Sequence, residues 1–337
     1  MGLADQVQDL VDTVESTRQA ITAHDVDLPP GSGLHAFPAA IDAIPKVSPP
    51  IDDSFPFPYD YPDIMDGYVT GTFRGLVLLD QNDDNNWVSF SVTASDGYRV
   101  NWGDGSSEQT FGSDVTCSHN FLWNSGGPIL SDGNRVRVVT VTPVSGAITK
   151  IDLIKLPDLW IPYAGRNSMW LDLAADIPGL TYFGLGQSRT IIRHGILRRV
   201  AKLNTSAVTN ATYLFNYCTS LTRLPDILDF SHVTNATYLF NNCTSLTRLP
   251  DILDFSQVTN APYLFSYCTS LTRLPATGLK VSSTVQRTAM GFAALNNFFE
   301  GLGTANAGAT INITECPGRT SCDTSIATSK GWTVIMS

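Results

Sequence analysis

The chain has 337 residues, which is long for one small domain, so we expect two or three compact units. Only 15% of the residues are charged, while Thr, Ser, Asn, Gly and Pro are frequent, a composition that favours a β-rich fold with many turns. The formal net charge of −10 argues against nucleic acid as a partner, because phosphate contacts need clustered Lys and Arg. No apolar run reaches the roughly 18 residues of a membrane-spanning helix, so we expect no membrane insertion.

Residues 2–22 carry a heptad pattern. Apolar and semi-polar positions alternate at spacings of four and three residues, namely Leu3, Val7, Leu10, Val14, Thr17 and Ile21. This pattern predicts an amphipathic helix that self-associates, with a trimer favoured, through Leu3, Val7, Leu10, Val14 and Ile21. A single helix packed on its own domain is the alternative. The first residues lack a basic region followed by an apolar core, so a secretory signal peptide is not expected.

Residues 28–66 are rich in proline and aromatic side chains. Nine of the 19 prolines lie between Pro29 and Pro62, and residues 55–62 read FPFPYDYP. Such a segment cannot be a helix or a central strand. We therefore expect an extended arm that lies along a surface, and we take residues 1–66 as an N-terminal helix with an anchoring arm.

Residues 67–149 alternate apolar and polar side chains with the period of a β-strand. Several such runs separated by Gly, Asp and Ser turns predict a β-sandwich. The residues VNWGDGSSEQTF at 100–111, followed by Ser118-His119-Asn120-Phe121, resemble the PKD family of Ig-like domains. The resemblance covers about a quarter of the chain and implies a spacer or adhesion module.

A repeat of 25 residues follows. Val208–His232 and Val233–Gln257 differ only at Tyr217/Asn242 and His232/Gln257, and a third, shorter copy runs from Val258 to Pro275. A period of this length with regular leucines predicts strand-and-turn units that stack, because one copy cannot bury its apolar side alone. The expected buried core comprises Leu214, Phe215, Cys218, Leu221, Leu224 and their equivalents 25 and 50 residues later.

The pattern LFxxCTSLTxLP resembles the BspA-like leucine-rich repeats of bacterial surface proteins and phage tail proteins. The resemblance implies a C-terminal leucine-rich-repeat solenoid over residues 150–337, with degenerate copies in Ile151–Leu203 and an α/β cap in Ala289–Ser337. The cap is expected to hold a helix at Met290–Leu302 and strands at Thr310–Thr314 and Trp332–Ile335. The residues CDTSIATSKGWTVI are similar to the C-terminal end of phage tail fibres. The expected fold is thus multidomain and mostly β.

Two columns of side chains recur with the repeat and form the candidate binding surface, namely Arg223, Arg248, Arg273, Tyr213, Tyr238 and Tyr263. One interpretation is a basic and aromatic strip that binds a host glycan or protein receptor. The other is a solvated ladder of weak surface ion pairs with Asp226, Asp229, Asp251 and Asp254, since duplication alone aligns any exposed residue.

Other polar patterns have structural interpretations. The asparagines of Asn210-Ala211-Thr212 and Asn235-Ala236-Thr237 are expected to be turn residues that bond to the neighbouring coil. Residues 80–86, DQNDDNN, begin like a calcium loop but lack its later ligands, so no metal is expected. A Cys316–Cys322 disulfide is geometrically possible but not expected without a secretory context. No catalytic motif is present, so we expect neither an enzyme nor a bound cofactor.

Composition alone indicates a β-rich multidomain protein, and the resemblance to phage tail fibres implies a bacteriophage virion protein of the tail-fibre or baseplate-appendage kind, assembled in the host cytoplasm. Residues 1–66 would bind other virion proteins, the sandwich would act as a spacer, and the repeats would contact the host. The alternatives are a head fibre or capsid decoration protein, a bacterial cell-surface adhesin, and a glycan-degrading virion enzyme.

Overall fold

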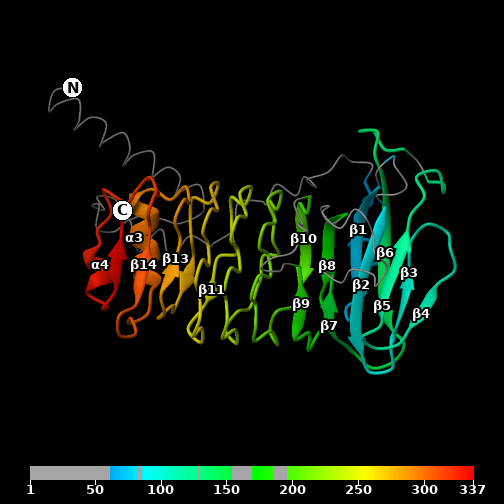
Figure 1. Cartoon of the computed structure of the whole chain (residues 1–337), viewed down its shortest axis with the longest axis horizontal. Coiled ribbons are helices and arrows are strands. Elements are labelled where there is room, and N and C mark those ends of the chain that lie inside the picture. Colours follow the sequence, from blue (N-terminus) through cyan, green and yellow to red (C-terminus); the bar gives the residue numbers. More distant parts are fainter. Residues whose placement is uncertain (1–60, 80, 82–85, 128, 154–168, 186–195) are drawn as a thin grey trace, which may run out of the picture. The chain divides into compact units, whose positions relative to one another are not determined.

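The computed structural model describes residues 61–79, 81, 86–127, 129–153, 169–185 and 196–337. This part of the chain is mostly β with few helices, as the sequence predicts (Figure 1). The predicted N-terminal helix, nearly all of the proline-rich arm and most of the loop at 80–86 lie outside the described residues. Within the described part, no helix is long and apolar enough to cross a membrane.

Two sheets open the described chain. The first has the order β10 (Arg199–Leu203), β8 (Trp170–Ala175), β1 (Phe73–Leu79), β6 (Arg135–Pro143), β3 (Tyr98–Asn101), β4 (Gln109–Phe111). The second has the order β5 (Thr116–Asn120), β2 (Trp87–Ala94), β7 (Ile148–Asp152), β9 (Tyr182–Gly184). Alternate residues of β6 are buried, as expected of strands with one face on a core.

Aromatic rings join the two sheets. Phe73 of β1 lies 6.3 Å from Phe90 of β2, and Trp170 of β8 lies 5.5 Å from Phe73 and 6.1 Å from Phe90. Gly75 makes room for this packing, since a Cβ on it would lie 2.2 Å from the Trp170 ring. An alanine at position 75 would therefore displace the ring at the centre of the core.

The Trp-Gly-Asp-Gly sequence forms a turn whose side chains hold one another. The Trp102 ring stacks on His119 at 4.7 Å, and His119 Nε2 lies 2.7 Å from Asp104 Oδ2. Gly103 has a φ of 74°, and a Cβ on it would lie 2.3 Å from the carbonyl oxygen of Val138. Only glycine fits this position, which explains why the motif needs this residue.

Both sheets continue into the coils that follow. β8 pairs antiparallel with β1 but parallel with β10, and β9 pairs parallel with β7. The predicted boundary between residues 149 and 150 falls inside β7. The chain therefore passes from antiparallel pairing to parallel stacking without leaving either sheet.

The 25-residue copies, here called the repeat array (residues 208–275), stack one coil per copy (Figure 1). The amide of Phe215 donates to Leu239 O at 2.9 Å, and Phe240 N donates to Leu264 O at 2.9 Å. Rings follow the same stacking, with Phe215, Phe240 and Phe265 separated by 5.2 and 5.1 Å. All the predicted core residues of the first copy and their equivalents are buried, so this prediction is confirmed.

The expectation of a strand in every copy is wrong. The array contains parallel bridges between Asn210, Asn235 and Asn260, turns, and the two-residue strand β11 (Leu253–Asp254) beside β12 (Ala276–Thr277). Tyr213 and Tyr217 have φ values of 61° and 58°, and their equivalents are similar. Because a left-handed residue interrupts extended backbone, two of them within five positions prevent a continuous strand.

The chain ends in a small α/β segment. It contains β13 (Ser283–Thr284), α3 (Phe292–Gly301), β14 (Thr310–Asn312), α4 (Ser325–Thr328) and β15 (Thr333–Ile335). The predicted helix at 290–302 and the two predicted strands are confirmed, each with shorter bounds. Cys316 and Cys322 are free thiols, and Cys316 Sγ donates to Val285 O at 3.3 Å.

Candidate binding surface

The repeat tyrosines form a continuous stack. The rings of Tyr213 and Tyr238 lie 5.2 Å apart, and those of Tyr238 and Tyr263 lie 4.7 Å apart, nearly parallel in both cases. Burial raises the pKa of Tyr238, and the phenols on either side raise it further. Because the outer rings cover both faces of Tyr238, it presents its edge to solvent, while Tyr263 is 42% exposed.

The repeat arginines form a second column. Arg273 pairs with Asp251 at 3.3 Å, and Arg248 reaches the same carboxyl group at 3.9 Å. The backbone carbonyl of the half-buried Arg223 accepts a hydrogen bond from the amide of Val200, in the preceding coil, at 3.0 Å. Within the described residues, no ion pair or ring contact joins Arg248 or Arg273 to the tyrosines. The six predicted residues therefore form two columns.

Asp251 matches the predicted ion-pair ladder, but two other aspartates of the repeats do not. Asp251 lies between two arginines, whereas Asp229 and Asp254 accept the backbone amides of Ser231 and Ser256 at 2.9 and 2.8 Å. The hydrogen bonds from Ser231 lower the pKa of Asp229. These two carboxylates stabilise turns in their own coil.

The repeat asparagines are turn residues, as predicted, but their partners differ. Asn210 Oδ1 accepts the amide of Thr212 at 3.0 Å, and Asn235 Oδ1 accepts that of Thr237 at 3.1 Å. The side chain of Asn260 in the third copy also reaches its neighbour, because its Nδ2 donates to Thr237 Oγ1 at 3.0 Å. A side-chain oxygen that accepts the amide two residues later closes a local turn, so the side chains of Asn210 and Asn235 bond within their own coil rather than to the neighbouring one.

Two exposed isoleucines were not predicted as surface residues. Ile227 and Ile252 occupy the same position in successive copies and are 80% and 72% exposed. Their neighbours Leu228 and Leu253 are buried. The alternation in PDILDF, with Ile outward and Leu inward, was available in the sequence but is too short to decide which of the two faces the core.

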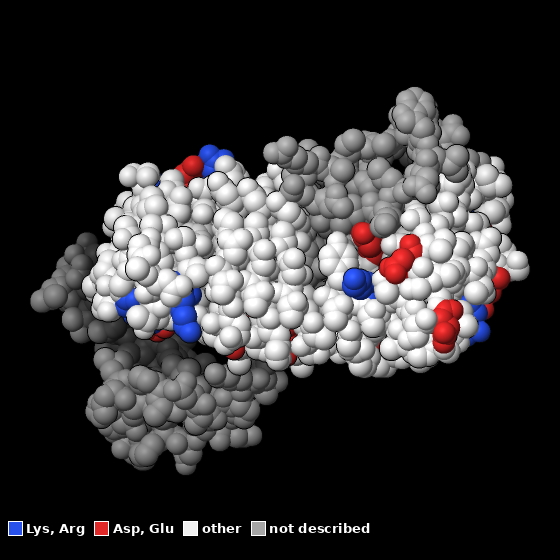
Figure 2. All heavy atoms as spheres, turned by 60° about the horizontal axis from the view of Figure 1, so that its bottom comes forward, with Lys and Arg blue, Asp and Glu red and all other residues white. Residues whose placement is uncertain are grey.

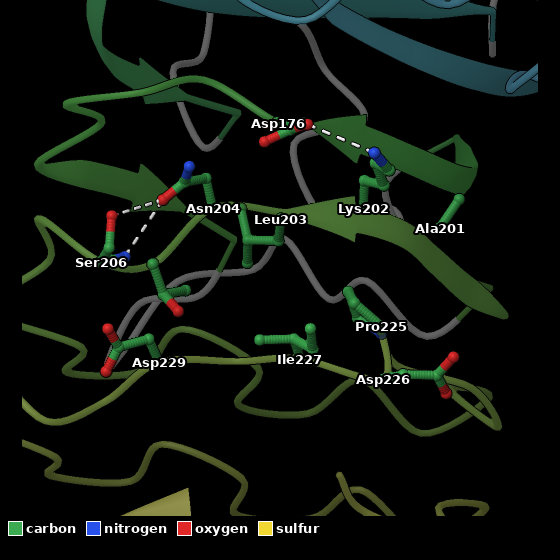
Figure 3. A pocket seen from close by; sticks show the side chains of 11 residues that line it. Asp176, Ala201, Lys202, Leu203, Asn204, Ser206, Pro225, Asp226, Ile227 and Asp229 are labelled. Atoms are coloured by element: carbon green, nitrogen blue, oxygen red, sulfur yellow. Dashed lines mark hydrogen bonds and ion pairs between the residues drawn. The ribbon is translucent and has the colours of Figure 1, made fainter. Parts of the chain in front are cut away.

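A pocket of about 530 Å³ lies beside Ile227, between the coil ending in β10 and the first copy of the array (Figure 3). Its lining residues are Asp176, Ala201, Lys202, Leu203, Asn204, Thr205, Ser206, Pro225, Asp226, Ile227 and Asp229. Lys202 Nζ pairs with Asp176 Oδ2 at 3.3 Å across one side. Sequence analysis missed this pocket because it depends on the stacking of two unlike coils.

Charge on the surface is sparse. On the face drawn in Figure 2, basic and acidic side chains form small groups separated by uncharged residues. No group of three or more His, Cys, Asp or Glu side chains within the described residues could hold a metal ion. The cysteine column is buried, and Cys243 and Cys268 donate to Phe215 O and Phe240 O at 3.0 Å.

Comparison with known proteins shows a family match that covers the array, the coil before it and the chain as far as α3. Residues 192–303 match the model of a family described as Mycoplasma protein of unknown function, DUF285. No curated protein and no solved structure matches the chain. The part of the chain from β10 to α3 is therefore similar to a family whose function is itself unknown.

Proposed function

We propose that this chain is a structural component of a bacteriophage virion, a tail fibre or baseplate appendage, which contacts the host surface through its repeat array. The observation that carries the proposal is the stacking of near-identical coils, which places equivalent exposed side chains on neighbouring turns. Repeated stacks of this kind build extended binding surfaces, and no catalytic motif accompanies the array.

The finer assignment of the fold belongs to the same proposal. The two sheets with the Trp102–His119–Asp104 turn support an Ig-like sandwich of the PKD kind. The stacked coils with buried leucine and cysteine columns support a leucine-rich-repeat solenoid of the BspA-like kind. The sandwich acts as the spacer and the solenoid as the part that meets the receptor.

The N-terminal region supplies attachment in this proposal. The heptad residues Leu3, Val7, Leu10, Val14 and Ile21 assemble three copies, and residues 1–66 bind neighbouring virion proteins. Sedimentation of the full-length chain should give a trimer, and Leu10→Asp should shift it toward monomer. A wild-type chain that stays monomeric at high concentration contradicts the trimer.

Cryo-electron microscopy of the intact source particle tests the location. The expected result is density for this chain on the tail, in multiples of three. Density on the head would replace the proposal with a head fibre, and a chain found only on bacterial cells would replace it with an adhesin. Release of reducing ends from host glycan by the purified chain would indicate an enzyme.

Adsorption to host cells tests the binding surface. The double substitution Tyr263→Ala with Arg273→Ala changes one exposed member of each column and should weaken adsorption of the full-length chain about tenfold or more. Arg99→Ala, an exposed arginine of β3 paired with Glu108, is the matched control and should leave adsorption unchanged. Equal adsorption by all three proteins contradicts a receptor role for the columns.

A further inference from the structure

The pocket beside the array lies where the aromatic column of the repeat is interrupted by one residue. Leu203-Asn204-Thr205-Ser206 aligns with Leu228-Asp229-Phe230-Ser231 exactly one 25-residue period later. Phe230 and Phe255 stack at 5.8 Å in successive copies, but the preceding coil has Thr205 in their place. Because threonine is much smaller than phenylalanine, the aromatic column ends there, next to the pocket that Thr205 lines.

Thr205 carries a buried polar group with no partner. The residue is only 2% exposed, and its hydroxyl makes no hydrogen bond in the described structure. Leaving a buried hydroxyl unpaired costs free energy, so such groups in native proteins call for an explanation. The hydroxyl is shielded from solvent as the side chain stands, so a rotation of Thr205 about χ1 would accompany binding and turn the hydroxyl toward a ligand that supplies the missing partner.

The other polar groups of the pocket are arranged around an apolar side chain. Figure 3 shows Asp226 and Asp229 at opposite ends of the lining with Ile227 between them. Asp229 Oδ1 is engaged by Ser231, while Asp229 Oδ2 and both oxygens of Asp226 accept no hydrogen bond from the described residues. Asn204 Oδ1 accepts from Ser206, and the Asn204 Nδ2 amide makes no bond within the same part of the chain.

We propose that this pocket binds a neutral saccharide, a sugar residue of a host-surface glycan, through Asn204, Thr205, Asp226, Asp229 and the apolar contact of Ile227. A sugar hydroxyl both donates and accepts, so it uses the free carboxylate oxygens and the free amide together. The C–H face of a sugar ring packs on an aliphatic side chain. A volume of about 530 Å³ lies within the range of small-ligand sites.

The charges of the pocket select against other ligands. Asp176, Asp226 and Asp229 outnumber Lys202 among its lining side chains, so an acidic sugar would be repelled. A cationic ligand would be attracted to the aspartates, but it would leave the amide of Asn204 unused and would meet the ammonium group of Lys202. A neutral, hydroxyl-rich ligand uses both the carboxylate oxygens and the amide without adding a charge.

Saturation-transfer NMR on the full-length chain tests the proposal with named probes. The panel contains methyl glycosides of glucose, galactose, mannose and N-acetylglucosamine, with sialic acid, glucuronic acid and putrescine as competitors of other charge. At least one neutral sugar should bind with a Kd of roughly millimolar order or tighter, and the charged probes should not. Binding of putrescine or of an acidic sugar alone overturns the proposal, as does binding of no probe.

Three substitutions in the pocket and one control outside it locate the site. Thr205→Phe continues the Phe230–Phe255 column into the pocket and should abolish binding. Thr205→Val keeps the shape without the hydroxyl and should weaken binding about 2- to 10-fold. Asp229→Asn should weaken sugar binding about tenfold. Asp254 forms the same turn in the next copy but lies outside the pocket, so Asp254→Asn should leave sugar binding unchanged. Equal effects of the two asparagine variants, or full binding by a folded Thr205→Phe chain, overturn the proposal.

The identification of the sugar as part of a host glycan rests on the proposed function, but the two can fail separately. If a neutral sugar binds while virion location or adsorption fails, the pocket is a saccharide site and the proposed function is wrong. If adsorption depends on the array while no sugar binds in the pocket, the proposed function stands and this inference is wrong.

Discussion

At the scale of single residues, burial controls the chemistry of the thiols. Burial raises the pKa of Cys117 to about 12, and it also raises the pKa values of Cys218 and Cys243. Cys322 is the one cysteine that is partly exposed. Since the thiolate is the reactive form, we expect the native chain to show at most one thiol that reacts readily with Ellman's reagent, lost in Cys322→Ser.

Denaturation without a reductant completes the thiol measurement. All six cysteines are free, so six thiols should then react. A count of four would indicate a disulfide, which the sequence alone left open for Cys316 and Cys322. Several thiols that react rapidly in the native chain would contradict the buried column.

Asp104 makes the stability of the Trp-Gly-Asp-Gly turn depend on pH. Burial acts to raise its pKa, but hydrogen bonds from the hydroxyl and amide of Ser106 and from His119 outweigh burial and lower it. A carboxyl whose pKa is lowered by folding stabilises the native state above its ordinary pKa, near 4, and loses that contribution as pH falls through the folded value. Asp104→Asn should therefore cost about 1–3 kcal/mol of unfolding free energy at pH 7.

Urea unfolding at pH 7, 5 and 3 measures this effect. The difference between wild type and Asp104→Asn should be smaller at pH 3 than at pH 5, because the carboxylate becomes protonated as pH falls through its folded pKa. Glu108→Gln, which removes an exposed ion pair with Arg99, is the control and should change stability by less than about 1 kcal/mol at each pH. A difference that grows between pH 5 and pH 3 would contradict the assigned hydrogen bonds.

At the scale of elements, the repeat array depends on columns of rings. Phe240 is fully buried and lies about 5 Å from both Phe215 and Phe265. Phe240→Ala would leave a cavity on both sides, and we expect a loss of about 3–5 kcal/mol. Tyr238→Phe keeps the neighbouring tyrosine stack and removes only an edge hydroxyl, so its cost should stay near zero. Chemical denaturation measures both, and a loss below about 1 kcal/mol for Phe240→Ala would show that the column is not a core.

Some elements of the fold could be predicted from the sequence and others could not. The buried positions of the array follow from the period, since Leu214 and Cys218 recur with every copy and one copy cannot bury them alone. The lack of a continuous strand in every copy depends on left-handed backbone at Tyr213 and Tyr217, and the residue type tyrosine does not predict that conformation. The pairing of β8 with β1 joins residues about a hundred positions apart, and no local pattern encodes it. The pocket also depends on non-local packing, because its lining comes from two successive coils.

At the scale of the whole molecule, the sheets and the array share one hydrophobic core. Trp170 belongs to the β8 strand that connects them, and its ring lies against Phe73 and Phe90. We expect the described region to unfold in one transition when unfolding is measured by circular dichroism. Trp170→Ala should lower the stability of both parts together, seen as faster hydrogen exchange in peptides from β6 and from residues 208–275. Two separate transitions would contradict a shared core.

Removing one whole copy tests the stacking in another way. Deletion of Val233–Gln257 joins His232 to Val258 and keeps the 25-residue register, so the first copy can stack directly on the third. Because each coil contacts only its neighbours, the variant should fold with a lower melting temperature, having lost one coil and one interface. The pocket lies before the deletion, so saccharide binding should persist unchanged. A deletion variant that fails to fold, while Phe240→Ala folds, would show that the copies are not interchangeable units.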